Sequence, residues 1–370
     1  MNRVIAIDTL RGLMLVLMMV VHLLLLPFIS ISNLLPYVYG PLGFFTDAEG
    51  FFFLSGLVAG IVYGRMFCEG RAEQASLRIY RRVKQIYFCQ MGLLIAVAIC
   101  LSISNLYFSN WKVVHDLVPV WKGNEGILFF LEHPFHAAAL GCFFLYLPPF
   151  LDILPMYILF LGITPYILGQ LSRERIRLVF GVSLVLWAAA QFIPSRILET
   201  TFRTYLPVVK LGWFDLMAWQ LLFVAGLALG FLKIQGRLRR PTALFTALSV
   251  GIAIFCCWLK YQVPAAQILA KLYVLGPLRL MSFGAIACIA WSFHQRIAIR
   301  PLAFLGRYSL QVFVYHTALC YLWVFFLVEI TSMPFLWKLG LISLSVLSLW
   351  LPAYFTDQLK KRNEIVRNLQ

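Results

Sequence analysis

Two residues of one expected helix, a histidine and an arginine, have the types and the spacing to do chemistry. His22 lies in the apolar stretch 13–31, and Arg11 precedes it by eleven residues. Eleven steps at 3.6 residues per turn make about three turns, so both side chains share one helix face, roughly 16 Å apart along the axis. A neutral imidazole can take a proton from a hydroxyl near neutral pH. The spacing therefore predicts a cationic group at one end of a helix and a proton-accepting ring near its middle.

Asp8 extends the same stripe, because it stands three residues before Arg11 and can pair with the guanidinium. A charged or titratable side chain at membrane depth is costly, so it faces the interior of a helix bundle and indicates function. A lone buried histidine is more often a packing residue. Because Arg11 and Asp8 lie on the same helix face, a chemical role is nevertheless favoured for His22.

Four further ionisable residues stand in apolar surroundings. Asp47 and Glu49 open a second expected helix, which continues through Ser55. Acidic residues in a first helical turn are also favoured by the helix dipole alone, so a structural and a functional interpretation remain open. His316 is centred in an expected span, and Asp152 stands between two prolines at the start of another. For His316 the packing interpretation is favoured, and a functional role is the alternative.

The elements that position these residues must be membrane helices. Hydrophobic residues make up 62% of the 370 residues and charged residues 12%, whereas a soluble domain carries about 25% charged residues. The mean hydropathy of +0.85 points the same way. This composition predicts an all-α polytopic membrane protein and excludes a soluble enzyme, a disordered regulator and a free nucleic-acid-binding module. Hydropathy windows of about 19 residues place ten spans, at 10–31, 50–67, 86–106, 150–169, 176–193, 213–232, 243–261, 274–293, 304–330 and 336–356.

The loops between these spans set the orientation. Lysine and arginine outnumber aspartate and glutamate by 31 to 15, which gives a net charge of +16. The basic residues gather in every second loop, as they do in cytoplasmic loops of membrane proteins. We therefore expect ten helices with both termini in the cytoplasm, in one integral-membrane domain over 1–370. The first apolar stretch is too long for a signal peptide, so we expect it to be retained.

The stretch 107–149 tests the number of spans. Its apolar part, 136–147, has the length of a re-entrant or interfacial element rather than of a span. Counting it as a span would place the basic loop near residue 175 on the outer side, so we expect it at the outer face. Whether 126–149 is re-entrant, interfacial or spanning stays open at this point.

The sequence lacks the motifs that several other kinds of chemistry require. The sequence contains no Gly-rich phosphate loop, no GxSxG elbow and no set of His and Cys at metal-binding spacing. The eight cysteines include no CxxC pair and lie mostly in apolar runs, so we expect them to be small packing residues. No metal, no nucleotide hydrolysis and no nucleic-acid partner are expected.

Several of these residues match a known pattern. The segment DTLRG at 8–12, followed by His22, resembles the first-helix signature of the membrane acyltransferase-3 superfamily. The segment 43–64 is similar, more narrowly, to the OpgC family, which is named for a membrane protein that succinylates osmoregulated periplasmic glucans. Further segments agree in the right order along the chain, at 151–158, 218–230, 276–285 and 305–316.

The resemblance implies a transferase of the bacterial inner membrane that moves an acyl group from a cytoplasmic acyl-CoA to an extracytoplasmic glycan hydroxyl. Succinyl-CoA is the implied donor, acetyl-CoA is the alternative, and a periplasmic glucan is the implied acceptor. The resemblance makes His22 the catalytic base and gives Arg11 a part in holding the donor. It assigns the other matching residues as follows: Asp47 and Glu49 to catalysis, Asp8 and Arg279 to donor binding, and Ser55, Asp152 and His316 to acceptor binding.

Two other functions remain open. Ten helices with buried histidine and arginine would also suit a proton-coupled transporter or flippase. Such carriers often have repeated halves with matching broken helices, but Pro155 and Pro165 in the span 150–169 have no counterpart in another half of the sequence. The third possibility is a non-catalytic subunit of a polysaccharide export system.

Overall fold

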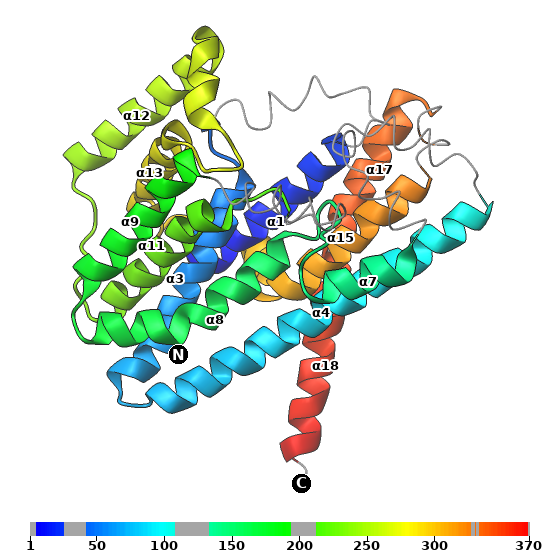
Figure 1. The fold of residues 1–370 in the computed structure, drawn as a ribbon, viewed down its shortest axis with the longest axis horizontal. Helices are drawn as coiled ribbons and strands as arrows, with labels where there is room; N and C mark the ends of the chain where they lie inside the picture. Colours follow the sequence, from blue (N-terminus) through cyan, green and yellow to red (C-terminus); the bar gives the residue numbers. More distant parts are fainter. Residues whose placement is uncertain are drawn as a thin grey trace. The chain divides into compact units, whose positions relative to one another are not determined.

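The computed structural model describes residues 5–25, 42–107, 133–193, 212–326, 330 and 333–368, and its elements within these ranges are helices (Figure 1). The all-α fold class is therefore confirmed. In this part of the chain seven helices are long and apolar enough to cross a membrane. The chain is thus a membrane protein, whereas the count of ten spans and the cytoplasmic termini stay predictions.

The candidate spans fall close to the predicted ones. Besides the seven long helices, the described part of the chain has two shorter apolar helices, α9 (Ile176–Phe192) and α13 (Pro277–Ser292). The seven long ones are α1 (Ile5–Leu25), α3 (Asp47–Cys68), the first part of α4 (Ala72–Tyr107), α8 (Ile153–Ser172), α11 (Leu216–Ile234), α12 (Ala243–Gln262), and a run over α17 (Phe335–Ser348) and α18 (Trp350–Asn368).

The chain divides into two compact units. The first unit holds residues 1–35, 96–123 and 294–370, and the second holds residues 36–95 and 124–293. The predicted site residues on the first helix and near the end of the chain therefore belong to the first unit. The single membrane domain over 1–370 stays a prediction.

In the second unit α3 and α11 pack backbone against backbone. A methyl group at Gly56 would lie 2.1 Å from the carbonyl oxygen of Phe223, and one at Gly60 would lie 2.2 Å from that of Leu227. Small residues let membrane helices approach closely, because lipid tails are as apolar as the side chains and supply no hydrophobic driving force. The contact points advance together on both helices, so α3 and α11 run in the same direction.

Helix α8 joins this pair with the same direction. The rings of Phe52 and Phe160 lie 5.8 Å apart, centroid to centroid. Farther along both helices, a methyl group at Gly64 would lie 3.7 Å from Leu168. The predicted second, fourth and sixth spans are thus parallel to one another, as an alternating up-and-down chain requires.

Helices α12 and α13 are antiparallel, as consecutive spans should be. Near one end, the hydroxyls of Thr246 and Ser292 lie 2.8 Å apart. Near the other end, a methyl group at Gly43 would lie 3.2 Å from Cys256 Cβ and 3.1 Å from Ser282 Oγ, so Gly43 touches both helices. Gly43 has a φ of +64°, a left-handed conformation that glycine adopts most readily.

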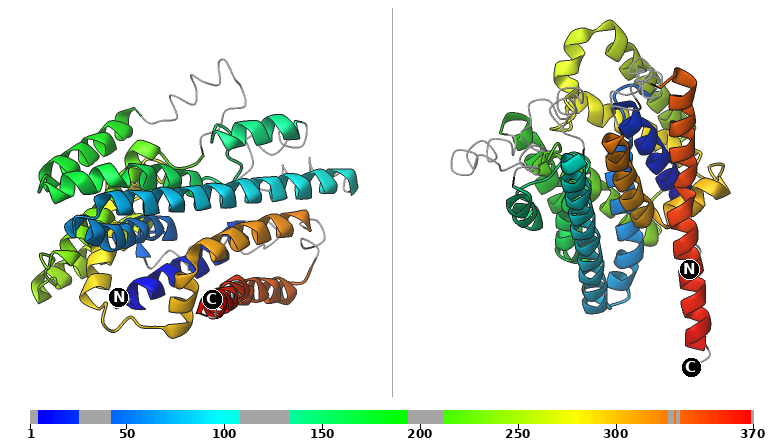
Figure 2. Two further views of the ribbon diagram at one scale, coloured as in Figure 1. Left: turned by 90° about the horizontal axis from the view of Figure 1, so that it is seen from below. Right: turned by 90° about the vertical axis from the view of Figure 1, so that its right-hand side faces the viewer.

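In the first unit α1 packs against α14 (Arg300–Arg307) and α15 (Ser309–Phe325). Figure 2 shows α1, in blue, beside α15, in orange. Arg11 contacts Ser309 at the start of α15, and His22 contacts His316 farther along it. The two helices are therefore parallel, as the first and ninth spans of the predicted topology must be.

Two side-chain contacts attach the last helices of the first unit. The Tyr308 hydroxyl, between α14 and α15, donates to Asp357 of α18, and Lys361 pairs with the same carboxylate across 2.8 Å. The Trp323 indole N–H donates to Ser345 Oγ of α17 across 2.8 Å. These contacts fix α17 and α18 against the helix that carries His316.

Some helix boundaries differ from the predicted spans. The expected span 304–330 is divided at Tyr308, where α14 ends and α15 begins. Helix α4 starts at Ala72, well before the expected 86, and α18 continues to Asn368, beyond the expected 356. Hydropathy windows detect only apolar residues, whereas lysine, arginine, glutamine and glutamate are good helix formers and extend these helices outside the apolar core.

The segment expected at the outer face contains a short helix, α7 (Pro134–Cys142). Its nine residues extend about 14 Å, less than half of the roughly 30 Å of a hydrocarbon core. Helix α7 alone is therefore too short to span a membrane. Residues 126–132 lie outside the described part of the chain.

Candidate functional site

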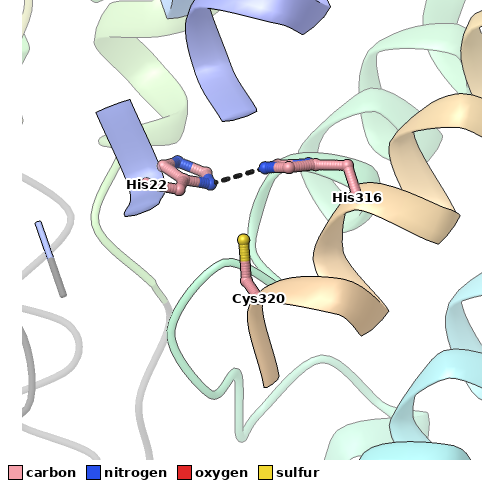
Figure 3. A group of neighbouring side chains, drawn as sticks. All are labelled: His22, His316 and Cys320. Atoms are coloured by element: carbon pink, nitrogen blue, oxygen red, sulfur yellow. Dashed lines mark hydrogen bonds between the residues drawn. The ribbon is translucent and has the colours of Figure 1, made fainter. Parts of the chain in front are cut away.

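A pair of histidines from two helices forms the centre of the candidate site. His22 Nδ1 of α1 lies 3.0 Å from His316 Nε2 of α15, although 294 positions separate the two in the sequence. The rings are stacked, with centroids 4.9 Å apart (Figure 3). His316 is fully buried, and Phe313 of the same helix presents its ring edge-on to it, with the centroids 5.8 Å apart. His22 is half-buried.

The direction of the hydrogen bond between the two rings decides whether Nε2 of His22 can accept a proton. A neutral imidazole carries one N–H and one free lone pair. If Nδ1 of His22 donates to Nε2 of His316, then Nε2 of His22 keeps its lone pair and can accept a proton. If Nε2 of His316 donates to Nδ1 of His22 instead, then Nε2 of His22 carries the proton and cannot accept another. The first arrangement makes His22 a base that its partner orients, as in sites where a second group holds a catalytic histidine.

Cys320 is a third member of this cluster that the sequence analysis did not single out. It stands four residues after His316 on α15, one helical turn along the same face. The Sγ atom of Cys320 and the nearest ring nitrogens of both histidines all lie within 4.8 Å of one another (Figure 3). We expected Cys320 to be a packing residue, and it is indeed fully buried. The spacing of His316 and Cys320 is the signal that could have revealed it.

The segment 8–12 of α1 docks this helix onto α14 and α15. The Thr9 hydroxyl accepts a bond from the N–H of Ile299, the residue that caps α14, across 3.2 Å. Nη2 of Arg11 donates to Ser309 Oγ across 2.6 Å. Arg11 is thereby held at the start of the helix that carries His316. The sequence pattern did not predict this contact with Ser309.

Two glycines allow this docking. A methyl group at Gly12 would lie 1.9 Å from the carbonyl oxygen of Leu302, and one at Gly306 would lie equally close, 1.9 Å, to that of Asp8. No side chain fits at either place, because backbone atoms cannot give way. Asp8 itself is buried, and its expected pairing with Arg11 stays a prediction.

In the second unit the structure brings Glu49 and Arg279 together. Oε1 of Glu49 accepts a hydrogen bond from Nη1 of Arg279 across 2.5 Å, and the carboxylate is fully buried. The other oxygen, Oε2, accepts from the backbone N–H of Thr46 across 2.9 Å, the reciprocal contact of a capping box at the start of α3. Glu49 thus neutralises an arginine whose side chain is 11% exposed and caps a helix, two roles that the sequence did not connect.

The remaining predicted residues of the second unit are all buried. Asp47 is the first residue of α3. Ser55 is 2% exposed, and its hydroxyl has no hydrogen-bond partner in the part of the chain that the structure describes. Oδ2 of Asp152, the N-cap residue of α8, accepts from the backbone N–H of Trp213 across 2.8 Å and so holds the chain before α11.

The predicted site residues therefore form two groups, one in each unit. In the first unit Arg11, His22 and His316 lie along one interface between α1 and α15, joined by Ser309 and Cys320. In the second unit Glu49 and Arg279 are in direct contact, and Asp152 makes a separate contact. The catalytic and binding roles of these residues stay predictions.

Comparison with known proteins gives one result. A family model described as "OpgC protein" matches residues 3–361, nearly the whole chain. Comparisons with curated proteins and with solved structures gave no match.

Proposed function

The chain belongs to the OpgC family, and from this membership we propose that it is an acyl-CoA-dependent O-acyltransferase of the bacterial inner membrane. The family indicates an acyltransferase-like role in glucan modification. We assign succinyl-CoA as the donor, with acetyl-CoA as the alternative, and a periplasmic glucan hydroxyl as the acceptor. The observation that carries the proposal is the contact of 3.0 Å between His22 and His316.

His22 is the general base of this proposal, and His316 is the residue that positions it. In this proposal the Nδ1–H group of His22 donates to Nε2 of His316, and the unprotonated Nε2 of His22 is the atom that accepts the proton. Because His316 is fully buried and held between α1 and Phe313, it can fix both the ring orientation and the tautomer of His22. This role differs from acceptor binding, the role that the family resemblance implies for His316.

Arg11 and Asp8 belong to donor binding. Coenzyme A is a polyanion that cannot cross hydrocarbon, but its thin pantetheine arm can enter between helices from a basic side. The planar guanidinium of Arg11 suits phosphate oxygens, and its contact with Ser309 holds it on the same interface as His22. About three turns of α1 separate it from His22, a distance that an extended arm can cover.

The reaction that follows is a direct acyl transfer. Nε2 of His22 removes the proton from a glycan hydroxyl as the oxygen attacks the thioester carbonyl. The tetrahedral intermediate collapses, the C–S bond breaks, and the coenzyme A thiolate takes the proton from the imidazolium. The products are the glycan ester and free coenzyme A. Holding both reactants in one site supplies much of the acceleration through orientation.

In the second unit the buried pair of Glu49 and Arg279 supports a shared role. We assign Glu49 and Asp47 to catalysis, with Arg279 holding the Glu49 carboxylate in place through their ion pair. The unsatisfied hydroxyl of Ser55 can receive a hydrogen bond from a hydroxyl-rich acceptor. Asp152 acts through the chain segment at Trp213, which it holds.

One assay tests the proposal. Purified full-length protein in detergent, given succinyl-CoA and a glucan, should release free thiol, and His22→Ala should abolish that release. His136→Ala is the matched control, because His136 is exposed on α7 and outside the cluster. Wild-type turnover by His22→Ala would show that the assigned base is wrong. A transporter would instead move labelled substrate into sealed vesicles and leave the thioester intact.

A further inference from the structure

The cluster of His22, His316 and Cys320 combines ligand types that metal ions bind. Two imidazoles and a thiol from two helices meet, with one donor atom of each within 4.8 Å of the others. Figure 3 shows the sulfur of Cys320 directed toward the space between the two rings. The sequence offered no ligand set because its members come from opposite ends of the chain, and only the packing of α1 on α15 unites them.

The distances suit a small tetrahedral ion. With metal–nitrogen distances of about 2.0 Å and a metal–sulfur distance of about 2.3 Å, two nitrogens lie about 3.3 Å apart and nitrogen and sulfur about 3.5 Å apart. The nitrogens of His22 and His316 are 3.0 Å apart, so they need to separate by only a few tenths of an ångström. The sulfur of Cys320 lies within 4.8 Å of the histidine nitrogens, so binding would draw it closer by up to about 1.3 Å. His316 and Cys320 stand four residues apart on one helix, which places both ligands on one face.

The chemistry of the donors selects the ion. Imidazole nitrogen and thiolate sulfur suit zinc and similar borderline-soft divalent ions, whereas calcium and magnesium require oxygen ligands. Two histidines and one cysteine leave a fourth tetrahedral position open, as in catalytic zinc sites. A divalent ion with one thiolate and one hydroxide is electrically neutral. A neutral complex is the form that a buried site among apolar helices can hold without an uncompensated charge.

We propose that His22, His316 and Cys320 form a binding site for one zinc-class divalent ion. The ion replaces the direct contact between Nδ1 of His22 and Nε2 of His316 and takes Cys320 as a thiolate. Binding at Nδ1 leaves the proton of His22 on Nε2. This last consequence rests on the proposed acyltransfer, because it means that an ion-loaded His22 cannot act as the base.

Cobalt spectroscopy tests the site without any measurement of activity. Full-length protein in detergent is titrated with Co²⁺ under reducing conditions. We expect one equivalent to produce visible bands of a tetrahedral ion and a near-ultraviolet charge-transfer band from thiolate. Cys320→Ser should lose the charge-transfer band, and His316→Ala should weaken binding by about tenfold or more. Cys256→Ser is the matched control, because Cys256 is also buried but lies outside the cluster.

Three results would overturn the site. They are the absence of stoichiometric cobalt binding by folded wild-type protein, a charge-transfer band that survives in Cys320→Ser, and a band that disappears in Cys256→Ser. Should Cys320→Ser fail to fold, X-ray absorption of zinc-loaded wild-type protein still decides, since the site requires one sulfur and two imidazole nitrogens around the ion.

The link to acyl transfer has its own measurement. Zinc should inhibit thiol release by wild-type protein, a chelator should restore it, and Cys320→Ser should require about tenfold more zinc for the same inhibition. An active protein without the cobalt band would refute the metal site and leave the acyltransferase proposal intact. A protein that forms the cobalt band when loaded but releases no thiol when metal-free would refute the acyltransferase proposal and leave the metal site intact. Full activity of zinc-saturated protein would refute the claim that an ion-loaded His22 cannot act as the base.

Discussion

Nη2 of Arg11 donates to the hydroxyl of Ser309 across 2.6 Å, and this bond joins the basic end of α1 to the first residue of α15. The next contact between the same helices, His22 with His316, brings the two rings together farther along. One interface thus carries a cation at one level and a histidine pair at another. This order suits the proposed acyl-CoA donor, which has a charged head and a long thin arm.

Replacing Arg11 by lysine should weaken donor binding without slowing the chemical step. Lysine keeps the charge but lacks the planar fork that binds phosphate with two hydrogen bonds. We expect KM for succinyl-CoA to rise about tenfold, equivalent to about 1.4 kcal/mol of binding, while kcat changes little. Arg240→Lys, in the basic segment after α11, is the control and should leave both constants unchanged. A fall in kcat at constant KM would place Arg11 in the chemical step instead.

Replacing His316 should slow the chemical step without weakening donor binding. His316→Ala removes the partner of Nδ1 of His22, and the loss of such a supporting contact lowers activity by about 10- to 100-fold. His316→Gln offers an amide oxygen as an alternative acceptor and should recover part of kcat. The test is steady-state kinetics of thiol release, with KM for succinyl-CoA unchanged in both variants. Equal kcat for alanine and glutamine would exclude a positioning role.

Periodicity within one helix predicted the arrangement on α1 well. The stripe of Asp8, Arg11 and His22 follows from 3.6 residues per turn, because neighbours on one helix are fixed by local geometry. The partners of that stripe could not be predicted in the same way. Ser309 and His316 lie almost 300 positions away, and their contact depends on tertiary packing through Gly12 and Gly306.

The fold shows the same division between local and non-local information. Long apolar stretches predicted membrane helices, and alternating basic loops predicted which helices run in parallel. The break at Tyr308 was missed, because α14 and α15 follow each other with a single residue between them, and a hydropathy window averages across such a turn. The pairing of Glu49 with Arg279 was missed because each residue alone suggested a different role.

Gly12→Ala should destabilise the first unit strongly. Its methyl group would lie 1.9 Å from the carbonyl oxygen of Leu302, so α1 would have to move away from α14. Overpacking of this kind costs about 1–3 kcal/mol, and here the obstacle is backbone. The measurement is the thermal unfolding midpoint in detergent. Gly340→Ala, on α17, is the matched control, because nothing lies within 4 Å of its added methyl group. An unchanged midpoint for Gly12→Ala would contradict the close packing of α1 on α14.

Glu49→Gln should destabilise the second unit through the arginine that it leaves behind. Removing one partner of a buried ion pair costs about 3–5 kcal/mol, because the other charge remains buried without compensation. Replacing both partners by apolar residues of similar size is often far less harmful. The double variant Glu49→Leu with Arg279→Met should therefore unfold closer to the wild-type midpoint than either single variant does.

The same double variant separates a structural from a catalytic role for Glu49. If the carboxylate takes part in acyl transfer, the double variant should be folded and yet release no thiol from succinyl-CoA. If the ion pair serves only to hold α3 and α13 together, the double variant should be both folded and active. A single Glu49→Gln variant as stable as the wild type would instead show that the pair of Glu49 and Arg279 does not exist in the folded protein, since no other described acidic group neutralises the buried end of Arg279.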